Sequence, residues 1–542
     1  MRETSIRQLA RWACRVTLDK VPLRVREQAV NQVLSTVAAV YSGWDSDLGR
    51  PIEMAFGPSP AAPGRARILP TGVPAPPTQA ALVMAAWSMV LDFDDVMLGG
   101  HTGHSSVLVP LAIVTAGGRS GAELILAQIV ANEVAARINM VCALGSTRGQ
   151  MATHLHLLAA AAARAKLEGL DENHFAEALS FAISYPSQAL FPAFLGSDAK
   201  ALCAAFAVRV GMEAIDAVQA GLTAAEDPLD DGRGFFAALS KAPVREFLGG
   251  LGERWHTETN SFKIYPVCGY LCSTLDATLD LVHQHDVLPS SVAAVDVWAS
   301  IFTFGMDAHS APYLDGPRSR ISTLTFSTPF TVASAILARR FTPEHLKRSW
   351  IENPRVWELA ARTRSHFDAG ITIDALTADI PIGAALRRTR RWQAAGFGWS
   401  LAGAAFGLRR WRSGASYRLA ASLAAAAGDC RPFDFQRATK PLGSRVEIRL
   451  ADGRTLTQTV SIPRGFAGAP RDHQGLSVRD LMRNKFVAAV GAAVGPERAS
   501  EAARLVEDLP TLSQSDIRRL FDLITISAAD AATDRMSHSR PV

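Results

Sequence analysis

The stretch SGAELILAQIVANEVAARINMVC, residues 120–142, shows the pattern that decides the fold. Its apolar side chains recur at helical spacing, and the same pattern, interrupted by glycine and proline, dominates the chain from residue 5 to about residue 251. No fixed period links these segments, which argues against a solenoid. The pattern predicts helices at 5–18, 22–43, 78–92, 106–116, 120–142, 151–168, 173–184, 199–220 and 233–241.

After residue 264 the pattern becomes mixed. Residues 292–304 (VAAVDVWASIFTF) and 444–456 (SRVEIRLADGRTL) have strand composition, and the second run contains the Asp-Gly turn of a hairpin. Helical runs lie between these two strands, and further ones follow at the end of the chain. The predicted fold class is therefore mostly α, with a large all-helical domain and a smaller α+β domain.

The same patterns give the domain boundaries. We expect the all-helical domain at 1–264, the α+β domain at 265–465, C-terminal helices that return to the helical domain at 466–528, and a flexible tail at 529–542. An arginine-rich segment at about 384–430 interrupts the α+β domain. We interpret it as a solvated loop or helical hairpin, with contact to a membrane surface as the alternative.

Composition excludes several classes of protein. The 542 residues are 48% hydrophobic and 20% charged, as in globular proteins, and the six cysteines form no CxxC pair that would suggest a metal or disulfide scaffold. The net charge of +5 is local, because eight arginines lie between residues 387 and 418 without any acid, so no nucleic-acid partner is expected. Neither a signal peptide nor a transmembrane segment is recognisable, which predicts a cytoplasmic protein.

The run LDFDDV (91–96) and the following GGHTGHSS (99–106) carry the most chemistry. Asp92, Asp94 and Asp95 repel one another unless cations or a proton offset their charges. His101 and His104 follow in a glycine-rich turn, so acids, bases and donors are predicted at one site. Thr102 and Gly103 separate the two histidines and no cysteine is near, so we predict no metal.

Two lysines supply possible anion-binding groups. Lys200, with Ser197, opens an alanine-rich helix, where free N–H groups attract anions. Lys263 precedes Tyr265 and Cys268 at the proposed domain junction, a favoured place for ligand sites. Alone, each lysine is also consistent with a structural role.

Several segments together resemble the MmgE/PrpD family, which includes 2-methylcitrate dehydratase, cis-aconitate decarboxylase and an iminodisuccinate epimerase. The order and spacing of these segments carry the resemblance, which covers most of the chain. They are LDFDD (91–95) with its His/Gly turn, ANEVAARI (131–138), AKLEGLDENHFAEALSFA (165–182), GSDAK (196–200), GLTAAEDPLDDGRGFFAAL (221–239), KIYPVCGYLCSTLDA (263–277), FSTPFTVASAIL (326–337) and ADGRTLTQTVSIPRG (451–465).

The resemblance implies a helical domain covered by an α+β lid, a homodimer, and catalysis on small polycarboxylates without metal or organic cofactor. The family's acidic motif falls on Asp92, with Asp94 and Asp95 beside it. Its histidine falls on His104 or, with a different gap, on His101, and its lysines on Lys200 and Lys263. We expect the first two aspartates, both histidines and both lysines to be catalytic, and we assign substrate binding to Asp95, Gln150, His154, Ser197, Tyr265 and Cys268.

Three positions depart from the family. Val96 stands where many members have threonine. Gln150 aligns with a second histidine of the family, and His154 and His156 lie close by in the sequence. Phe304 falls near a tyrosine of the decarboxylases, which the resemblance places in the first strand of the lid. These departures argue against decarboxylation of cis-aconitate and weaken the case for 2-methylcitrate.

We therefore predict a cofactor-independent lyase that removes water from a small polycarboxylate, similar to 2-methylcitrate dehydratase. Decarboxylation or epimerisation of a related acid is the first alternative, because the same groups serve all three reactions. A non-catalytic carboxylate-binding or scaffold protein is the alternative from another class, motivated by the three departures.

Overall fold

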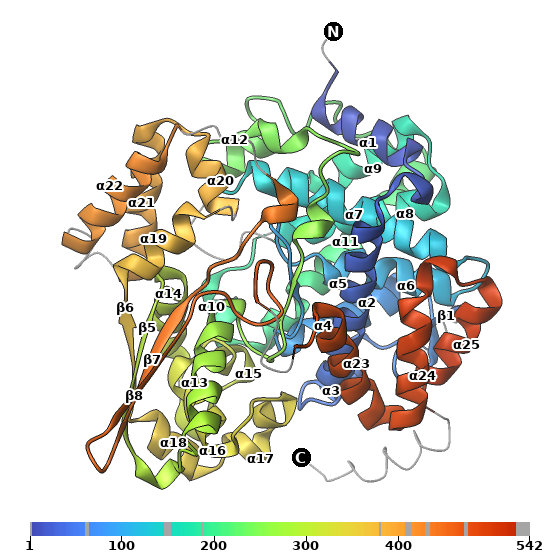
Figure 1. The fold of residues 1–542 in the computed structure, drawn as a ribbon. Coiled ribbons are helices and arrows are strands. Elements are labelled where there is room, and N and C mark those ends of the chain that lie inside the picture. Colours follow the sequence, from blue (N-terminus) through green and yellow to red (C-terminus); the bar gives the residue numbers. More distant parts are fainter. Residues whose placement is uncertain are drawn as a thin grey trace.

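The fold is mostly α-helical and has two parts (Figure 1). A computed structural model describes residues 3–59, 64–145, 153–186, 188–378, 381–406, 414–428, 434–470 and 475–526. On one side lie helices from both ends of the chain, and on the other a four-stranded sheet with its own helices. This confirms the predicted fold class.

The larger part is built around helices that are buried on nearly every side. In α4 and α7 apolar residues surround the helix axis, as expected for central helices. Two short strand pairs also occur in this part of the chain. The helices are α1 (Ser5–Arg15), α2 (Leu23–Trp44), α3 (Gly49–Phe56), α4 (Pro77–Val90), α5 (Gly103–Ser106), α6 (Leu108–Thr115), α7 (Gly121–Val141), α8 (Thr153–Glu168), α9 (Glu172–Ile183), α10 (Phe191–Gly196), α11 (Leu202–Gln219) and α12 (Phe235–Leu239), and the strands are β1 (Ala66–Ile68), β2 (Val73–Ala75), β3 (Asp95–Val96) and β4 (Ser261–Phe262).

The stretch 120–142 forms α7, as predicted. Ser120 caps the helix by accepting a hydrogen bond from the backbone N–H of Glu123, whose carboxylate accepts one from the Ser120 backbone. Among the described helices, α7 alone is long and apolar enough to cross a membrane, but 89% of that apolar window is buried inside the fold. The apolar surface of α7 is therefore already covered by other helices.

The smaller part contains a sheet with the strand order β6-β5-β7-β8. β5 (Val292–Ala299) pairs in parallel with β6 (Thr363–Phe367) and antiparallel with β7 (Ser444–Leu450), which forms the predicted hairpin with β8 (Thr455–Val460). Gly453 takes a φ of 90° in the hairpin turn, a conformation that favours glycine. Its helices are α13 (Cys272–Gln284), α14 (Ile301–Ser310), α15 (Ile321–Leu324), α16 (Thr328–Ala338), α17 (Arg348–Ile351), α18 (Pro354–Ala360) and α19 (Ala369–Thr377).

The predicted strand at 292–304 is wrong in its second half. β5 ends at Ala299, and the Ile301 backbone donates a hydrogen bond to the Thr372 hydroxyl as α14 begins. Phe304 therefore lies on a helix and not on the first strand of the lid. Aromatic and β-branched runs of this length do not distinguish helix from strand by composition alone.

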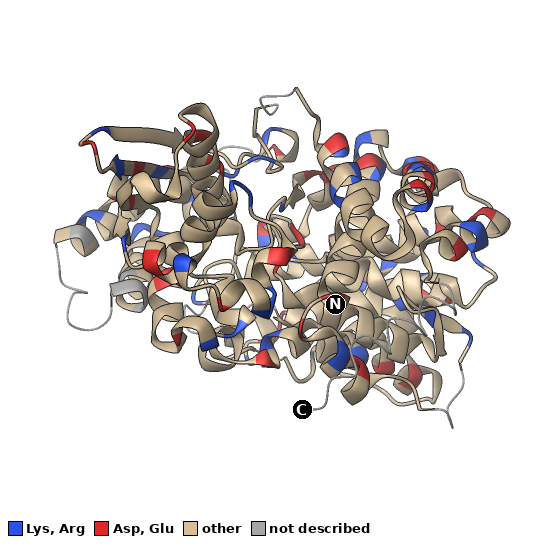
Figure 2. Ribbon diagram, turned by 90° about the horizontal axis from the view of Figure 1, so that it is seen from below, with Lys and Arg blue, Asp and Glu red and all other residues tan. Residues whose placement is uncertain are grey.

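The arginine-rich segment contains a helical hairpin. It comprises α20 (Pro381–Arg387), α21 (Arg391–Phe406) and α22 (Gly414–Ala426), and α21 packs along α22 (Figure 1). Arg388 forms an ion pair with Glu246 of the larger part, with 2.7 Å between Nε and Oε2. In the view of Figure 2, basic and acidic residues are interspersed over both parts of the molecule.

The C-terminal helices pack on the larger part. They are α23 (Val478–Val494), α24 (Pro496–Glu507) and α25 (Gln514–Ile524), and α23 lies against α2. Ser477 and Asp480 form a capping box at the start of α23, which fixes where this helix begins. The proposed flexible tail at 529–542 lies outside the described residues.

Candidate active site

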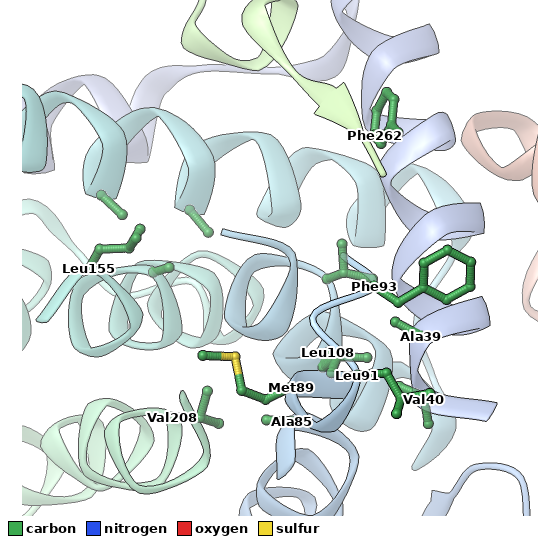
Figure 3. Packing of buried hydrophobic residues seen from close by; sticks show 14 of the residues in the cluster. Ala39, Val40, Ala85, Met89, Leu91, Phe93, Leu108, Leu155, Val208 and Phe262 are labelled. Carbon is green, nitrogen blue, oxygen red and sulfur yellow. The ribbon is translucent and has the colours of Figure 1, made fainter. Parts of the chain in front are cut away.

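A short strand pairing brings the acidic run to Lys263. β3 pairs antiparallel with β4, so Asp95 lies opposite Phe262, and the Lys263 backbone N–H donates to the Asp94 carbonyl at 3.2 Å. Leu91 and Phe93 point toward Ala39 and Val40 of α2 in the apolar core (Figure 3). Apolar and acidic side chains alternate along residues 91–94. Asp92 and Asp94, between and after the two apolar residues, bind the Lys263 ammonium group.

Lys263 joins the two aspartates. Its Nζ donates to Asp92 Oδ2 at 2.8 Å, to Asp94 Oδ1 at 2.7 Å and to the Asp92 carbonyl at 2.9 Å. All three ammonium protons are used, and the side chain is fully buried. Asp92 has a φ of 54°, the left-handed region, so its backbone is held in an uncommon conformation at this position.

The charges of this cluster stabilise one another. Burial works to raise the pKa of Asp92, but Lys200 and Lys263 outweigh it and lower that pKa. Burial also works to raise the pKa of Asp94, but Lys263 and the two histidines outweigh it and hold that pKa well below the usual value. Burial works to lower the pKa of Lys263, but both aspartates raise it. Both carboxylates and Lys263 are therefore ionised at neutral pH.

Lys200 is the second cation of the cluster. Its Nζ lies 3.0 Å from Asp92 Oδ1 and donates to the Met89 carbonyl at 3.0 Å. The ammonium group lies 5.6 Å from the ring centre of Phe194 and 5.7 Å from that of Phe326. Ser197 caps the short helical turn that carries Lys200, so its hydroxyl binds main chain.

Both histidines of the glycine-rich turn approach the same oxygen of Asp94. His101 Nδ1 lies 2.7 Å from Asp94 Oδ2, and His104 Nε2 lies 3.1 Å from it. The His101 side chain is 26% exposed, whereas His104 is buried and its Nδ1 lies 2.8 Å from the Ser88 hydroxyl. Of the two, only His101 lines the cavity described below.

Asp95 lies on the other side of the turn. It accepts hydrogen bonds from Gln32 Nε2 at 2.8 Å and from the Gly103 backbone N–H at 3.1 Å. A Cβ at Gly103 would lie 2.1 Å from Asp95 Oδ1, so this approach requires glycine. Burial raises the pKa of Asp95. These contacts place Asp95 in the packing between the turn and α2.

The remaining predicted site residues are scattered around the cluster. His154 Nε2 lies 2.9 Å from Asn139 Oδ1, and burial lowers the pKa of His154 to about 4. The Tyr265 hydroxyl donates to Asp276 at 2.9 Å, so its proton is used outside the cluster. Cys268 is buried near the cluster, and burial raises its pKa to about 12, which keeps the thiol protonated. Gln150 lies outside the described residues.

A small cavity borders the cluster. It offers about 10 Å³ to the centre of a water molecule, room for roughly one water. Any compound larger than a water molecule fits this cavity only if the lining side chains move. The lining residues are Met89, Asp92, Asp94, His101, Thr153, His156, Phe194 and Cys203.

Sequence reasoning did not assign five of the lining residues to the site, namely the apolar Met89 and Phe194 together with Thr153, His156 and Cys203. His156 Nδ1 lies 3.1 Å from the Ser105 hydroxyl, and burial, with the neighbouring histidines, lowers the pKa of His156 well below its usual value. Thr153 contacts Cys203, with 3.2 Å between Oγ1 and Sγ. Only the proximity of His156 to His154 in the sequence could have identified it; Thr153 and Cys203 carry no such indication.

The polar groups of this site can hold and move protons. Within the described residues, no group of three His, Cys, Asp or Glu side chains is arranged to hold a metal ion. The carboxylates contact lysines and imidazoles, so the cluster can stabilise a proton held by either imidazole.

The chain belongs to the MmgE/PrpD family. Residues 7–247 match the family's N-terminal domain, and residues 265–388 match its C-terminal domain. Together the two matches cover more than half of the chain and confirm the resemblance drawn from its motifs. The hairpin of α21 and α22 and the C-terminal helices lie beyond the matched residues.

Curated relatives were also found. The chain is 27% identical over 304 residues to a cis-aconitate decarboxylase of Aspergillus terreus, a match that covers 52% of this chain and 61% of the relative. A second cis-aconitate decarboxylase, from Aspergillus terreus strain NIH 2624 / FGSC A1156, is 26% identical over the same shares. The chain thus matches about three fifths of the length of these relatives.

Proposed function

We propose that the protein is a cofactor-independent lyase that removes water from a small hydroxy-polycarboxylate. The observation that carries this proposal is Asp94, an ionised carboxylate held by Lys263 on one oxygen and approached by His101 and His104 on the other. Family membership supports the substrate class. The substrate that we propose first is 2-methylcitrate.

His101 is the base in this proposal. With Nδ1 on Asp94, its Nε2 is left to accept a proton, and the residue lines the cavity. Asp94 orients the ring and stabilises the imidazolium that forms after the proton is removed from the carbon next to a carboxylate. The same imidazolium, or His104 behind it, returns a proton to the departing hydroxide.

Lys200 binds a substrate carboxylate in this proposal, while Lys263, whose three protons are already used, holds Asp92 and Asp94 in place. Both now bind Asp92, and two ammonium groups beside two carboxylates leave no net positive charge for an added anion. Substrate therefore enters by competing with Asp92 for Lys200, as the cavity opens. Lys200 can make this exchange because its two aromatic neighbours hold the ammonium group in place.

Decarboxylation is the second candidate. The named relatives are cis-aconitate decarboxylases, and a carbanion formed by loss of CO₂ would take its proton from the same His101. Epimerisation would use the same base on one face of a carbon. A non-catalytic polycarboxylate-binding protein remains the candidate from another class.

Proton NMR in D₂O with EDTA separates these functions. The purified protein is incubated with 2-methylcitrate, citrate, cis-aconitate and amino-dicarboxylates. We expect a hydroxy acid to lose water and give an unsaturated product, at an unchanged rate with EDTA. Release of CO₂ from cis-aconitate would establish the decarboxylase instead. Binding without turnover or exchange across the panel would establish the non-catalytic protein.

We also propose that the protein is a cytoplasmic homodimer, because the family resemblance implies this assembly. Light scattering coupled to size exclusion should give twice the mass of 58.0 kDa. A monomer at micromolar concentration would contradict the proposed dimer.

A further inference from the structure

Lys485 of α23 reaches the acidic run from the C-terminal third of the chain. Its Nζ donates to the Phe93 carbonyl at 2.6 Å, to the Lys263 carbonyl at 2.9 Å and to the Ser35 hydroxyl at 2.9 Å. The ammonium group also lies 3.8 Å from the ring centre of Phe93. Three acceptors match the three protons of an ammonium group, so the site is built for the charged form.

These bonds join the two backbone segments that carry the catalytic cluster. Phe93 lies between Asp92 and Asp94, and the second carbonyl belongs to Lys263 itself. A second buried lysine, Lys440, donates to the Val96 carbonyl two residues beyond Asp94. Both lysines lie beyond residue 388, where the family match ends.

We infer that Lys485 is a positioning residue. It fixes the position of Asp94 relative to Lys263, and through Asp94 it orients His101 toward the substrate. The inference rests on the proposed function for its kinetic readout only. Lys485 does not touch the cavity, and its contacts are a hydroxyl, two carbonyls and a ring. Lys485 therefore affects the reaction indirectly, through the positions of the two backbone segments that it binds.

The charge of Lys485 is poorly compensated. Burial lowers its pKa to about 7, with Asp94 and Asp95 raising it and Lys263 lowering it; Cys272 is the other titratable neighbour. Above pH 7 the neutral amine keeps two protons for the two carbonyls and accepts from the Ser35 hydroxyl, so these bonds are no longer charge-assisted and hold the two segments more weakly. Turnover should therefore fall as the pH rises through about 7, on account of this lysine.

Lys166 offers a matched control. It too donates to three oxygen atoms, the carbonyls of Ala13, Cys14 and Val16, and burial lowers its pKa, but it lies at the end of α8 away from the cluster. We compare Lys485→Met with Lys166→Met. We expect kcat to fall about 10- to 10²-fold in Lys485→Met, with KM changed less, and to stay within about twofold in Lys166→Met. The decline of turnover above pH 7 should be absent from the first variant and kept in the second.

A readout without substrate separates this inference from the proposed function. The downfield proton signal of the His101–Asp94 hydrogen bond should shift or broaden in Lys485→Met and not in Lys166→Met. If the signal changes in Lys485→Met but wild type turns over none of the acids tested by NMR, the proposed function is wrong and the positioning role stands. If Lys485→Met does not fold, Lys485→Gln takes its place. An unchanged signal together with an unchanged kcat and pH profile would overturn the inference.

Discussion

Two buried groups of charges in the larger part have different architectures. Glu133 and Arg137 lie one turn apart on α7, and their partners are each other and residues 247–257. The Asp92, Asp94, Lys200 and Lys263 cluster comes from three separate segments, and two of its members line a cavity.

The electrostatics of the two groups differ as well. Burial raises the pKa of Glu133, and Arg137 with three N–H and O–H donors does not fully offset it. The pKa of Asp94 is lowered because Lys263 and two imidazoles approach it. The first group anchors the chain that leads to β4 and Lys263, while the second borders a cavity, where we propose that substrate replaces one of its partners. A buried ion pair is thus structural or functional according to what surrounds it.

Removal of Lys263 should give the largest effect, because this lysine both stabilises the cluster of Asp92 and Asp94 and positions its carboxylates for turnover. Lys263→Met leaves two carboxylates buried without their shared cation. We expect the free energy of unfolding to fall by about 3–5 kcal/mol and turnover to be lost. Urea denaturation and the NMR assay measure the two effects. Full activity in a stable variant would show that this lysine does not belong to the site.

Glu133→Gln should affect stability alone. The change replaces one carboxylate oxygen, which accepts from Arg137 or from backbone N–H groups, by an NH2 donor, and we expect a loss of about 1–3 kcal/mol. The rate per folded molecule should remain within about twofold of wild type, because no atom of this pair reaches the cavity. A large drop in kcat at a temperature where the variant is folded would contradict the separation of the two groups.

The acid dependence of stability should distinguish the two groups with opposite signs. The pKa values of Asp92 and Asp94 are below that of an ordinary aspartate, so the unfolded chain takes up protons first and stability falls as the pH drops below about 5. The pKa of Glu133 is raised, so its protonation opposes this loss. Unfolding midpoints at pH 6, 5 and 4 should decline less in Lys263→Met and more in Glu133→Gln. Equal slopes in all three proteins would refute this assignment.

Ser88→Ala should give the smallest effect. The Ser88 hydroxyl lies against Nδ1 of His104, the imidazole behind His101. Loss of one buried hydrogen bond is expected to cost about 1 kcal/mol of stability and to lower turnover by less than tenfold. Thermal unfolding and initial rates suffice for this test. A drop as large as that from loss of His101 would make His104 the principal base.

Local pattern predicted what is local in this molecule. The 3.6-residue period indicated α7, and the crowded carboxylates with nearby histidines indicated that these side chains would lie together around Asp94. The pairing of β3 with β4 could not be predicted, because two-residue strands carry no periodicity. Lys485 gave no indication either, since a lysine on an amphipathic helix is usually exposed and its three acceptors come from distant segments.

Solvent deuterium exchange tests the central claim, that His101 on Asp94 moves the proton next to a substrate carboxylate. Wild type and His101→Asn are incubated in D₂O with the acid that the NMR panel identifies, and deuterium at that carbon is followed by mass spectrometry. The account predicts exchange in wild type, and a rate lower by about 10²–10⁴-fold in His101→Asn, with stability within about 1 kcal/mol. Equal exchange in both proteins would contradict it.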